Sequence, residues 1–310
     1  MTHAEIDVLV TQFMKETAAG PDRAKATPRV REITARLLGD VFKAIEDLDM
    51  SPSEVWAGLD YIQECGRQGE VALLAAGLGL ERFLDIRMDE AEAKAGIEGG
   101  TPRTIEGPLY VAGAPVCEGF AVLDDGRDHH RAEILFMRGK VASVDGKTLP
   151  GARVEVWHAN PDGAYSYFDE TQTSFNLRRT IVTDKGGQYG FRSIVPSGYG
   201  CPPDGPTQKA LDLLGRHGQR PAHIHFYVSA PGHRGLTTQI TIDGDAYLWK
   251  DFAFAERDGL LPEVKRVSDP DTLERAGLKA PFALIEFDFT LVPETPGAPD
   301  PSVKRKRAEA

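Results

Sequence analysis

The chain has 310 residues, 41% of them hydrophobic and 8% aromatic, and a formal net charge of −11 at pH 7. This composition is ordinary for a globular protein with a sizeable core. The negative charge excludes a general nucleic-acid binder, which would need a basic face, and favours work on small molecules.

The N-terminus and the cysteines indicate where the protein works. The first residues read MTHAEIDVLVTQFMKETAAG, without the basic segment and cleavage site of a signal peptide, and no stretch reaches the roughly 18 apolar residues of a membrane span. The three cysteines, Cys65, Cys117 and Cys201, are widely spaced and fit neither a disulfide framework nor a zinc ribbon. We therefore expect a cytoplasmic protein that is neither exported nor embedded in a membrane.

The N-terminal part of the chain has the pattern of helices. In residues 27–48 apolar side chains recur at steps of three and four and form one stripe, made of Val30, Ile33, Leu37, Val41 and Ile45. In residues 50–65, Ser51 and Glu54 are spaced as a capping box at the start of a second helix. Residues 70–85 are apolar on more than one face, which predicts a helix packed within its own fold or against a partner.

Short alternating runs separated by turns follow. Residues 283–292 read ALIEFDFTLV and predict a half-buried strand whose apolar face holds Ile285, Phe287, Phe289 and Leu291. The pairs Asp145-Gly146 and Asp243-Gly244 predict tight turns beside strand-like runs. No long helices alternate with these strands, so the sequence predicts an antiparallel β-sandwich and, with the helical part, an α+β fold.

These patterns divide the chain into three parts. A helical N-terminal region covers residues 1–104, a β-sandwich domain covers residues 105–292, and a tail covers residues 293–310. The tail reads PETPGAPDPSVKRKRAEA and is rich in proline and charge, which predicts disorder. Its KRKR run is interpreted as a solvated end of the chain.

One stretch of the sandwich places two imidazoles on the same face. Residues 220–233 read RPAHIHFYVSAPGH, and side chains alternate along a strand, so the apolar residues share one face while His223, His225 and Tyr227 share the other. Burying two histidines costs free energy unless a partner satisfies them. A metal ion is one such partner, and local hydrogen bonds or surface exposure are the ordinary alternatives.

The residues that accompany the histidines indicate which metal would fit. The glutamate that follows His-x-His in cupin-like sites is missing, and no cysteine pair or helical histidine motif supports zinc. Neighbouring segments instead offer the tyrosines Tyr165, Tyr167 and Tyr199, each of which has the alternative role of an ordinary packed aromatic. A phenolate is a hard anionic donor, so two phenolates with two neutral imidazoles suit ferric iron.

Three segments together resemble the intradiol ring-cleaving dioxygenases. They read LPGARVEVWHANPDGAYSYFD at 149–169, LRRTIVTDKGGQYGFRSIVPSGYGCPPDGPTQ at 177–208 and RPAHIHFYVSAPGHRGLTTQI at 220–240. The resemblance extends from the helical region through the sandwich to about residue 292. It implies intradiol cleavage of catechol with dioxygen to cis,cis-muconate, in the degradation of aromatic compounds.

The same resemblance implies a metal centre. One non-haem Fe(3+) ion per subunit would be ligated by Tyr165, Tyr199, His223 and His225, with solvent in the fifth position. Tyr167 competes for the place of the first tyrosine, and Tyr165 is preferred because the family's ligand stands two residues after the glycine of its Gly-x-Tyr segment.

Further catalytic roles also come from the resemblance. Tyr199 would leave the metal and take a substrate proton, while Arg220 and Gln239 would lie over the substrate ring. Without the resemblance, Arg220 would be read as a surface cation and Gln239 as a polar residue of a strand.

The resemblance also implies which residues contact the substrate. The pocket would be lined by Leu73, Ile105, Pro108, Leu109, Arg220, Phe252 and Ala253. Chlorocatechol relatives typically carry Phe at the place of Leu109 and often Cys at that of Ala253, so unsubstituted catechol is favoured. An enzyme for chlorocatechols or hydroxyquinol is the alternative within the family, and a transthyretin-like binding module is the alternative without catalysis.

The N-terminal helices are expected to bind a second subunit. Their apolar stripes exceed what one sandwich face has to cover, and the family pairs its subunits through these helices with a lipid between them. The resemblance therefore implies a homodimer with phospholipid at the helical interface. No nucleic-acid partner is expected.

Overall fold

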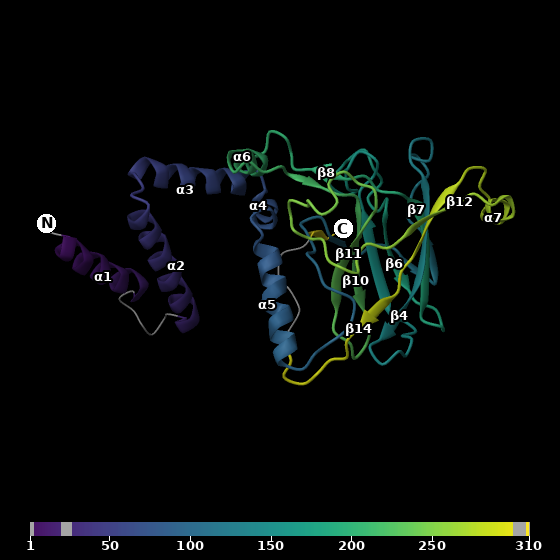
Figure 1. Cartoon of the computed structure of the whole chain (residues 1–310), viewed down its shortest axis with the longest axis horizontal. Helices are drawn as coiled ribbons and strands as arrows, with labels where there is room; N and C mark the ends of the chain where they lie inside the picture. The colour runs from purple at the N-terminus through teal and green to yellow at the C-terminus, as the bar shows by residue number, and fades with distance from the viewer. Residues whose placement is uncertain (1–2, 20–26, 300–307, 310) are drawn as a thin grey trace. The chain divides into compact units, whose positions relative to one another are not determined.

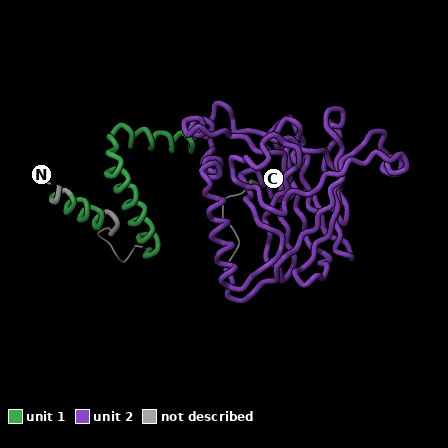
Figure 2. The backbone as a smooth tube through the Cα atoms, in the orientation of Figure 1, with its two compact units in different colours: residues 1–66 green, residues 67–310 purple. Residues whose placement is uncertain are grey.

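The structure, a computed structural model, describes residues 3–19, 27–299 and 308–309. The chain forms two compact units, residues 1–66 and 67–310, which Figure 2 distinguishes by colour. The boundary between the units falls inside the region 1–104 that the sequence sets apart as helical. The second unit contains both large β-sheets and every residue that the resemblance assigns to the site.

Three helices make up the first unit, namely α1 (His3–Ala19), α2 (Pro28–Asp47) and α3 (Pro52–Arg67), which ends just past the unit boundary (Figure 1). The predicted capping box of α3 is confirmed, because the Glu54 N–H donates to Ser51 Oγ (3.3 Å) and the Ser51 N–H donates to the Glu54 carboxylate (2.8 Å). Most of the predicted stripe of α2 is exposed, with exposed fractions of 59%, 43%, 60% and 52% for Val30, Ile33, Leu37 and Val41, whereas Ile45 is half-buried.

The predicted helix over residues 70–85 is two helices in the structure. Helix α4 (Val71–Gly77) ends before Leu78, and α5 (Leu80–Lys94) begins after Gly79, whose φ is 78°. A continuous helix cannot contain a residue in this left-handed conformation, which glycine adopts at little cost. Two shorter helices follow later in the chain, α6 (Pro206–Leu213) and α7 (Pro270–Ala276). Within the described residues, none of the helices combines the length and the apolarity that a membrane crossing requires.

Two sheets carry the rest of the fold (Figure 1). In the order of their hydrogen-bonded neighbours, the first sheet contains β11 (Leu236–Thr241), β10 (His223–Ser229), β5 (Arg153–His158), β6 (Arg178–Val182) and β2 (Val116–Glu118). The second sheet contains β12 (Val264–Val267), β13 (Phe282–Glu286), β4 (Ile134–Ser143), β7 (Gln188–Ile194) and β3 (Phe120–Val122), with β14 (Phe289–Leu291) also paired to β4.

The sheets are mixed rather than purely antiparallel. Inside the first sheet β5 pairs with β6 and β10, and β10 with β11, all antiparallel, whereas β2 joins β6 in parallel. In the second sheet β3 joins β7 and β13 joins β4 in parallel. The α+β class predicted from the sequence is confirmed. The parallel pairs were not predicted, because they join strands that are distant in the sequence.

The hydrophobic core lies between the two sheets. Alternate residues of β10 (Ile224, Phe226 and Val228) are fully buried and pack with residues of the opposite sheet, among them Leu135, Met137, Phe191, Ile285 and Phe289. Because strand side chains alternate, this packing turns His223 and His225 away from the core.

The predicted strand 283–292 is split into β13 and β14 at Phe287 and Asp288. The Phe287 carbonyl crosses β4 so closely at Gly139 that a Cβ on Gly139 would lie 1.7 Å from the carbonyl oxygen. Asp288 Oδ1 accepts the N–H of Lys140 (2.9 Å), which takes the place of a regular ladder bond. Both halves pair in parallel with β4, so the break interrupts the strand but leaves both halves in the sheet.

The two predicted turns form, but neither closes a hairpin between long strands. Gly146 and Gly244 have φ of 85° and 89°, as tight turns require. The chain after Gly146 crosses from β4 to β5 in the other sheet, and the chain after Gly244 continues as an irregular loop up to β12. This loop, residues 245–257, carries part of the site described below.

Two short strand pairs complete the description. They are β1 (Val111–Ala112) with β15 (Ala308–Glu309), and β8 (Tyr199–Gly200) with β9 (Gln219–Arg220). The expected disorder of the tail 293–310 stays a prediction, because residues 300–307 and 310 lie outside the described part of the chain.

We expect Gly139→Ala to lower the free energy of unfolding by about 3 kcal/mol or more, because the added methyl group cannot fit beside the Phe287 carbonyl without moving β4 or β14. Gly186→Ala is the matched control, since its nearest neighbours are side-chain atoms 3.3 Å or more away. Urea unfolding of both variants measures the difference. Equal midpoints for Gly139→Ala and the wild type would contradict the close crossing.

Candidate functional site

Two histidines of β10 lie side by side on the face of the first sheet that is turned away from the core. His223 Nε2 and His225 Nε2 are 3.0 Å apart, and each side chain is 1% exposed. The strands β5 and β11 flank β10 on both sides, so the backbone at this point has no freedom to turn the imidazoles outward. His225 also stacks on Trp157 of β5, with ring centroids 4.9 Å apart and planes within 2°.

Tyr165 reaches the histidines from the loop that follows β5. Asn160 Oδ1 accepts the N–H groups of Asp162 (3.0 Å) and Ala164 (2.9 Å), which folds the loop back over the end of the strand. Gly163 has a φ of 77°, and a Cβ there would lie 2.5 Å from Tyr199 Cβ. The glycine two residues before Tyr165 is therefore needed so that the two tyrosines can approach each other.

Tyr199 comes from β8 and completes a group of four donors. Its hydroxyl oxygen lies 3.4 Å from Tyr165 Oη and 3.4 Å from His223 Nε2, and Tyr165 Oη lies 3.4 Å from His223 Nε2. Tyr167, the competing residue in the sequence, is 42% exposed and packs against Phe168. The structure thus brings Tyr165, and not Tyr167, to the histidines.

Both imidazoles are neutral at physiological pH. Burial, followed by the nearby Arg220 guanidinium, lowers the pKa of His223 to about 3. Burial, followed by His223 and Arg220, also holds the pKa of His225 well below its ordinary value of 6.5. His223 Nδ1 lies 2.6 Å from Pro221 O, and a carbonyl only accepts, so Nδ1 carries the proton and Nε2 presents a lone pair to the cluster.

A fixed cation lies beside the four donors. Arg220 donates through Nη2 to Asp251 Oδ2 (2.9 Å) and through Nε to Asp251 Oδ1 (3.1 Å), and Nη1 lies 3.0 Å from His223 Nε2. Both side chains of this ion pair are buried. Burial alone would lower the pKa of Arg220, but Asp251 and the tyrosines outweigh it and raise the pKa, so the guanidinium stays charged.

Gln239 of β11 extends this network and leaves one donor unused. Its Oε1 accepts from Arg220 Nη2 (2.9 Å), while its Nε2 is buried without a hydrogen-bond partner in the described part of the chain. A buried amide donor without a partner costs free energy. The site therefore has an N–H group available to an oxygen atom of a bound molecule.

The four donor atoms suit ligation of a ferric ion better than hydrogen bonds among themselves. Burial, and then the neighbouring Tyr199, raises the pKa of Tyr165 well above its ordinary value of 10, so its phenolate form needs a cation at the centre of the cluster. His225 presents its Nε2 to the same point as His223, with the two Nε2 atoms 3.0 Å apart. Two phenol oxygens and two neutral imidazole nitrogens that converge in this way are a donor set of the kind that binds Fe(3+).

An apolar wall lies next to the donors. Ile105, Phe252 and Ala253 are buried in one hydrophobic cluster with Ala76, Cys201, Leu211 and Ala255, and Leu73 packs against it. Leu109 belongs to a second cluster that includes Tyr165 and Tyr199. Pro108 is exposed, between Leu109 and Gly107, and a Cβ on Gly107 would lie 3.7 Å from His225 Cε1.

Sequence reasoning missed two charged residues of the site. Asp251 had no motif around it and lies in an irregular loop, so only its contact with Arg220 identifies it. Arg178 is 1% exposed, donates to Leu109 O (2.9 Å) and Ser166 Oγ (3.0 Å), and lies 5.7 Å from the Tyr165 ring centroid. Burial lowers the pKa of Arg178 to about 10. An arginine in the middle of an alternating run gave no signal of this role.

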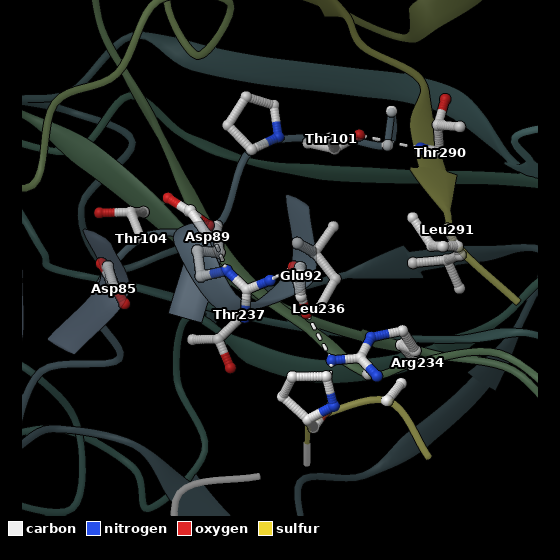
Figure 3. Close-up of a pocket in the computed structure, with 18 of the residues that line it drawn as sticks. Asp85, Asp89, Glu92, Thr101, Thr104, Arg234, Leu236, Thr237, Thr290 and Leu291 are labelled. Carbon is white, nitrogen blue, oxygen red and sulfur yellow. Dashed lines mark hydrogen bonds and ion pairs between the residues drawn. The ribbon is translucent and has the colours of Figure 1, made fainter. Parts of the chain in front are cut away.

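The large cavity in Figure 3 is separate from this cluster. It measures about 770 Å³ and lies between α5, the start of β11 and the end of β14, with Asp85 and Asp89 among its lining residues. Neither the two tyrosines nor the two histidines line it. Its arginines are paired with its own carboxylates, Arg103 with Asp89 and Glu92, and Arg234 with Glu92. The convergence of donors, and not this cavity, marks the candidate site.

Comparisons with known proteins give a consistent result. A family described as Dioxygenase matches residues 105–293, and one described as Catechol dioxygenase N terminus matches residues 27–96. Catechol 1,2-dioxygenase of Acinetobacter guillouiae is 54% identical over 299 residues, which are 96% of this chain and 97% of the relative.

A solved structure and a less similar relative also carry the name of a catechol or chlorocatechol 1,2-dioxygenase. The crystal structure of wild-type catechol 1,2-dioxygenase from Acinetobacter radioresistens has a TM-score of 0.93 at 54% identity and covers 100% of this chain and 99% of that one. Chlorocatechol 1,2-dioxygenase of Pseudomonas putida is 35% identical over 246 residues, 79% of this chain and 88% of the relative.

We expect Asp251→Asn to lower the free energy of unfolding by about 3–5 kcal/mol, because it leaves the buried Arg220 charge without a carboxylate. The control is Glu286→Gln, which removes a carboxylate from exposed ion pairs with Arg138 and Lys265 and should change stability by less than about 1 kcal/mol. Urea unfolding measures both. If the two variants unfold at the same urea concentration, the Arg220–Asp251 pair does not stabilise the fold by the expected amount.

Proposed function

Because the chain belongs to the intradiol ring-cleaving dioxygenases, we propose that it cleaves catechol with dioxygen to cis,cis-muconate, in the degradation of aromatic compounds. The ring opens between the two hydroxylated carbons, and both oxygen atoms end in the two carboxylates of the product. The observation that carries the proposal is the convergence of two phenols and two imidazoles beside a buried, charged arginine.

The metal that fits this site is one non-haem Fe(3+) ion per subunit, held by Tyr165, Tyr199, His223 and His225. When bound, it would supply Lewis-acid chemistry toward the oxygen atoms of the substrate. The support for this assignment is the donor set itself, together with the tautomer of His223, whose Nε2 presents a lone pair to the cluster, and the approach of His225 Nε2 to the same point.

The protein residues supply proton transfer, charge and position. Tyr199 is half-buried on a strand of two residues, whereas Tyr165 is 3% exposed and enclosed by its loop, so Tyr199 is better placed to accept a proton from a substrate hydroxyl. Arg220, held by Asp251, offers a fixed positive charge to the negative charge that develops on the substrate. Gln239 Nε2 has a free donor for a substrate oxygen.

The apolar wall favours an unsubstituted ring. Leu73, Ile105, Pro108, Leu109, Phe252 and Ala253 are the residues that we assign to the ring, beside Arg220. Leu109 and Ala253 differ from the Phe and Cys that chlorocatechol enzymes typically carry, and the chain is less similar to the chlorocatechol enzyme of Pseudomonas putida than to the catechol enzyme of Acinetobacter guillouiae. An enzyme for chlorocatechols or hydroxyquinol is the second candidate. The three cysteines are free, which fits the cytoplasm that we propose as its location.

Oxygen uptake on catechol, methylcatechol, chlorocatechol and hydroxyquinol tests the proposed substrate. We expect catechol to give the highest kcat/KM, one iron atom per subunit by elemental analysis, and a visible tyrosinate-to-iron absorption that disappears when the iron is removed. A colourless, iron-free preparation that still cleaves catechol would contradict the metal assignment. A higher kcat/KM on a substituted ring would move the substrate to the second candidate.

We expect Tyr199→Phe to fold like the wild type, to bind iron in part with a shifted visible band, and to lose roughly a hundredfold in turnover. The ring packing is kept, while the phenol that accepts the proton is lost. His223→Ala and His225→Ala should instead lose more iron than Tyr199→Phe does, since the strand offers no replacement donor. Steady-state kinetics, iron content and the visible spectrum measure the comparison. Wild-type turnover with an unchanged spectrum in Tyr199→Phe would show that Tyr199 is neither ligand nor base.

We also propose that the N-terminal helices pair two subunits with phospholipid at the interface. The support is the apolar stripe of α2, which is exposed from Val30 to Val41 in the single chain, and the exposed Trp56, Leu59 and Ile62 of α3. Apolar faces of this extent on a soluble enzyme mark a surface for a partner or a lipid.

Light scattering at micromolar concentration should therefore give the mass of a dimer, and mass spectra of gently extracted protein should contain phospholipid. Leu37→Glu, which places a charge in the middle of the exposed stripe, should shift the protein toward the monomer. The control Arg36→Gln changes an exposed residue of the same helix outside the stripe. A wild-type monomer would remove the dimer, and lipid-free extracts would remove the lipid.

A further inference from the structure

We propose that Arg216 is a positioning residue that sets the width of the substrate pocket, by tying helix α4 to the loop that carries Phe252 and Ala253. The inference rests on the proposed function, because it concerns the apolar wall that we assign to the catechol ring. Arg216 itself touches none of the four donors; it acts through the backbone of the two wall segments.

The guanidinium of Arg216 bonds two segments that are far apart in the sequence. Nη1 donates to the carbonyl of Gly77, the last residue of α4 (2.7 Å), and Nη2 donates to the carbonyl of Phe252 (3.1 Å). The backbone N–H of Arg216 donates to Leu211 O (2.8 Å), which fixes the base of the side chain at the end of α6. A planar guanidinium with several donors holds two carbonyls in a set geometry.

The two segments also pack closely where Arg216 joins them. A Cβ on Gly77 would lie 3.0 Å from Phe252 Cε2, so α4 lies directly against the Phe252 ring. A Cβ on Gly79 would lie 3.4 Å from the ring of Phe254, and the Arg216 guanidinium lies 4.8 Å from the centroid of the same ring. The contacts of Arg216 therefore hold the junction between α4 and α5 as well as the loop.

The loop needs such a restraint because its own backbone is strained. Trp249 and Phe254 have φ of 61° and 55°, conformations that residues other than glycine rarely adopt. Between them, Asp251 holds Arg220 on one side of the loop. Arg216 holds the other side, through Phe252. The ion pair thus fixes the charged part of the site, and Arg216 fixes the apolar part.

The consequence concerns substrate width. Leu73 and Ala76 of α4 meet Phe252 and Ala253 in one apolar cluster, so the separation of α4 and the loop decides how large a ring fits between them. When the Arg216 bonds are lost, the wall can open. A wider pocket holds catechol less firmly and discriminates less against a ring that carries a substituent.

The test is Arg216→Gln in the full-length, iron-loaded enzyme. We expect KM for catechol to rise about tenfold while kcat changes by less than about threefold, as for loss of a residue that acts on binding rather than on the reacting atoms. The preference for catechol over 4-methylcatechol, as a ratio of kcat/KM values, should fall about fivefold, within the range that a methyl-sized change in a pocket commands. The dissociation constant of catechol, measured without dioxygen, should rise with KM. Arg216→Lys should restore part of each change, because an ammonium reaches one carbonyl but cannot bridge both.

A second variant separates the role of Arg216 from a general loss of stability. Gly77→Ala keeps Arg216 and adds a methyl group 3.0 Å from Phe252 Cε2, which forces α4 and Phe252 apart, so it should lower the preference for catechol over 4-methylcatechol as Arg216→Gln does. The control is Arg82→Gln. Arg82 lines the same groove of about 520 Å³ as Arg216, but of these two arginines only Arg216 donates to the carbonyls of Gly77 and Phe252. Thermal unfolding and iron content show whether each variant is folded and loaded.

An unchanged ratio in Arg216→Gln would overturn the proposal, as would an equal loss of kcat on both substrates. A shift of Gly77→Ala and Arg216→Gln in opposite directions would also overturn it. These outcomes are independent of the proposed function, which is decided by whether the wild-type enzyme cleaves catechol at all.

Discussion

The structure depends on the strand β10, which buries apolar side chains on one face and two polar imidazoles on the other. The apolar side of β10 is fully buried between the sheets, and its other side holds two imidazoles that are equally buried. Buried imidazoles are costly inside a protein unless polar partners satisfy them, so the strand requires polar groups gathered over this face. The loops that carry Tyr165, Tyr199 and Asp251 meet this requirement.

The Arg220–Asp251 ion pair connects this cluster to the rest of the site. Arg220 pairs with Tyr199 across β8 and β9, and Asp251 lies in the irregular loop after β11, so the pair joins two segments that share no sheet. Asp251 and the nearby tyrosines keep the guanidinium charged despite its burial, and the ion pair holds it in place, as a group that stabilises developing charge requires. The same loop carries Phe252 and Ala253 of the apolar wall, so charge and shape are set by neighbouring residues.

Much of the fold and of the donor set could be predicted from local patterns. Alternation gave the two faces of β10, and the capping box gave the start of α3. Patterns failed where a contact between distant residues decided the backbone. The apolar run 70–85 is broken by the left-handed Gly79, and the run 283–292 is split where Phe287 crosses Gly139. Neither the crossing nor the parallel pairing of β13 with β4 leaves a mark in the local sequence.

By itself the sequence determined the α+β class, the face on which His223 and His225 lie, and the tyrosines available to them, because strand periodicity and residue chemistry are local properties. The resemblance favoured Tyr165 over Tyr167, but only the tertiary structure gave the physical reason, since one is buried beside the histidines and the other is exposed. The tertiary structure alone identified Asp251 and Arg216, which act through contacts with residues distant in the chain. Such contacts depend on how loops pack over a finished sheet, and that packing is a property of the whole fold.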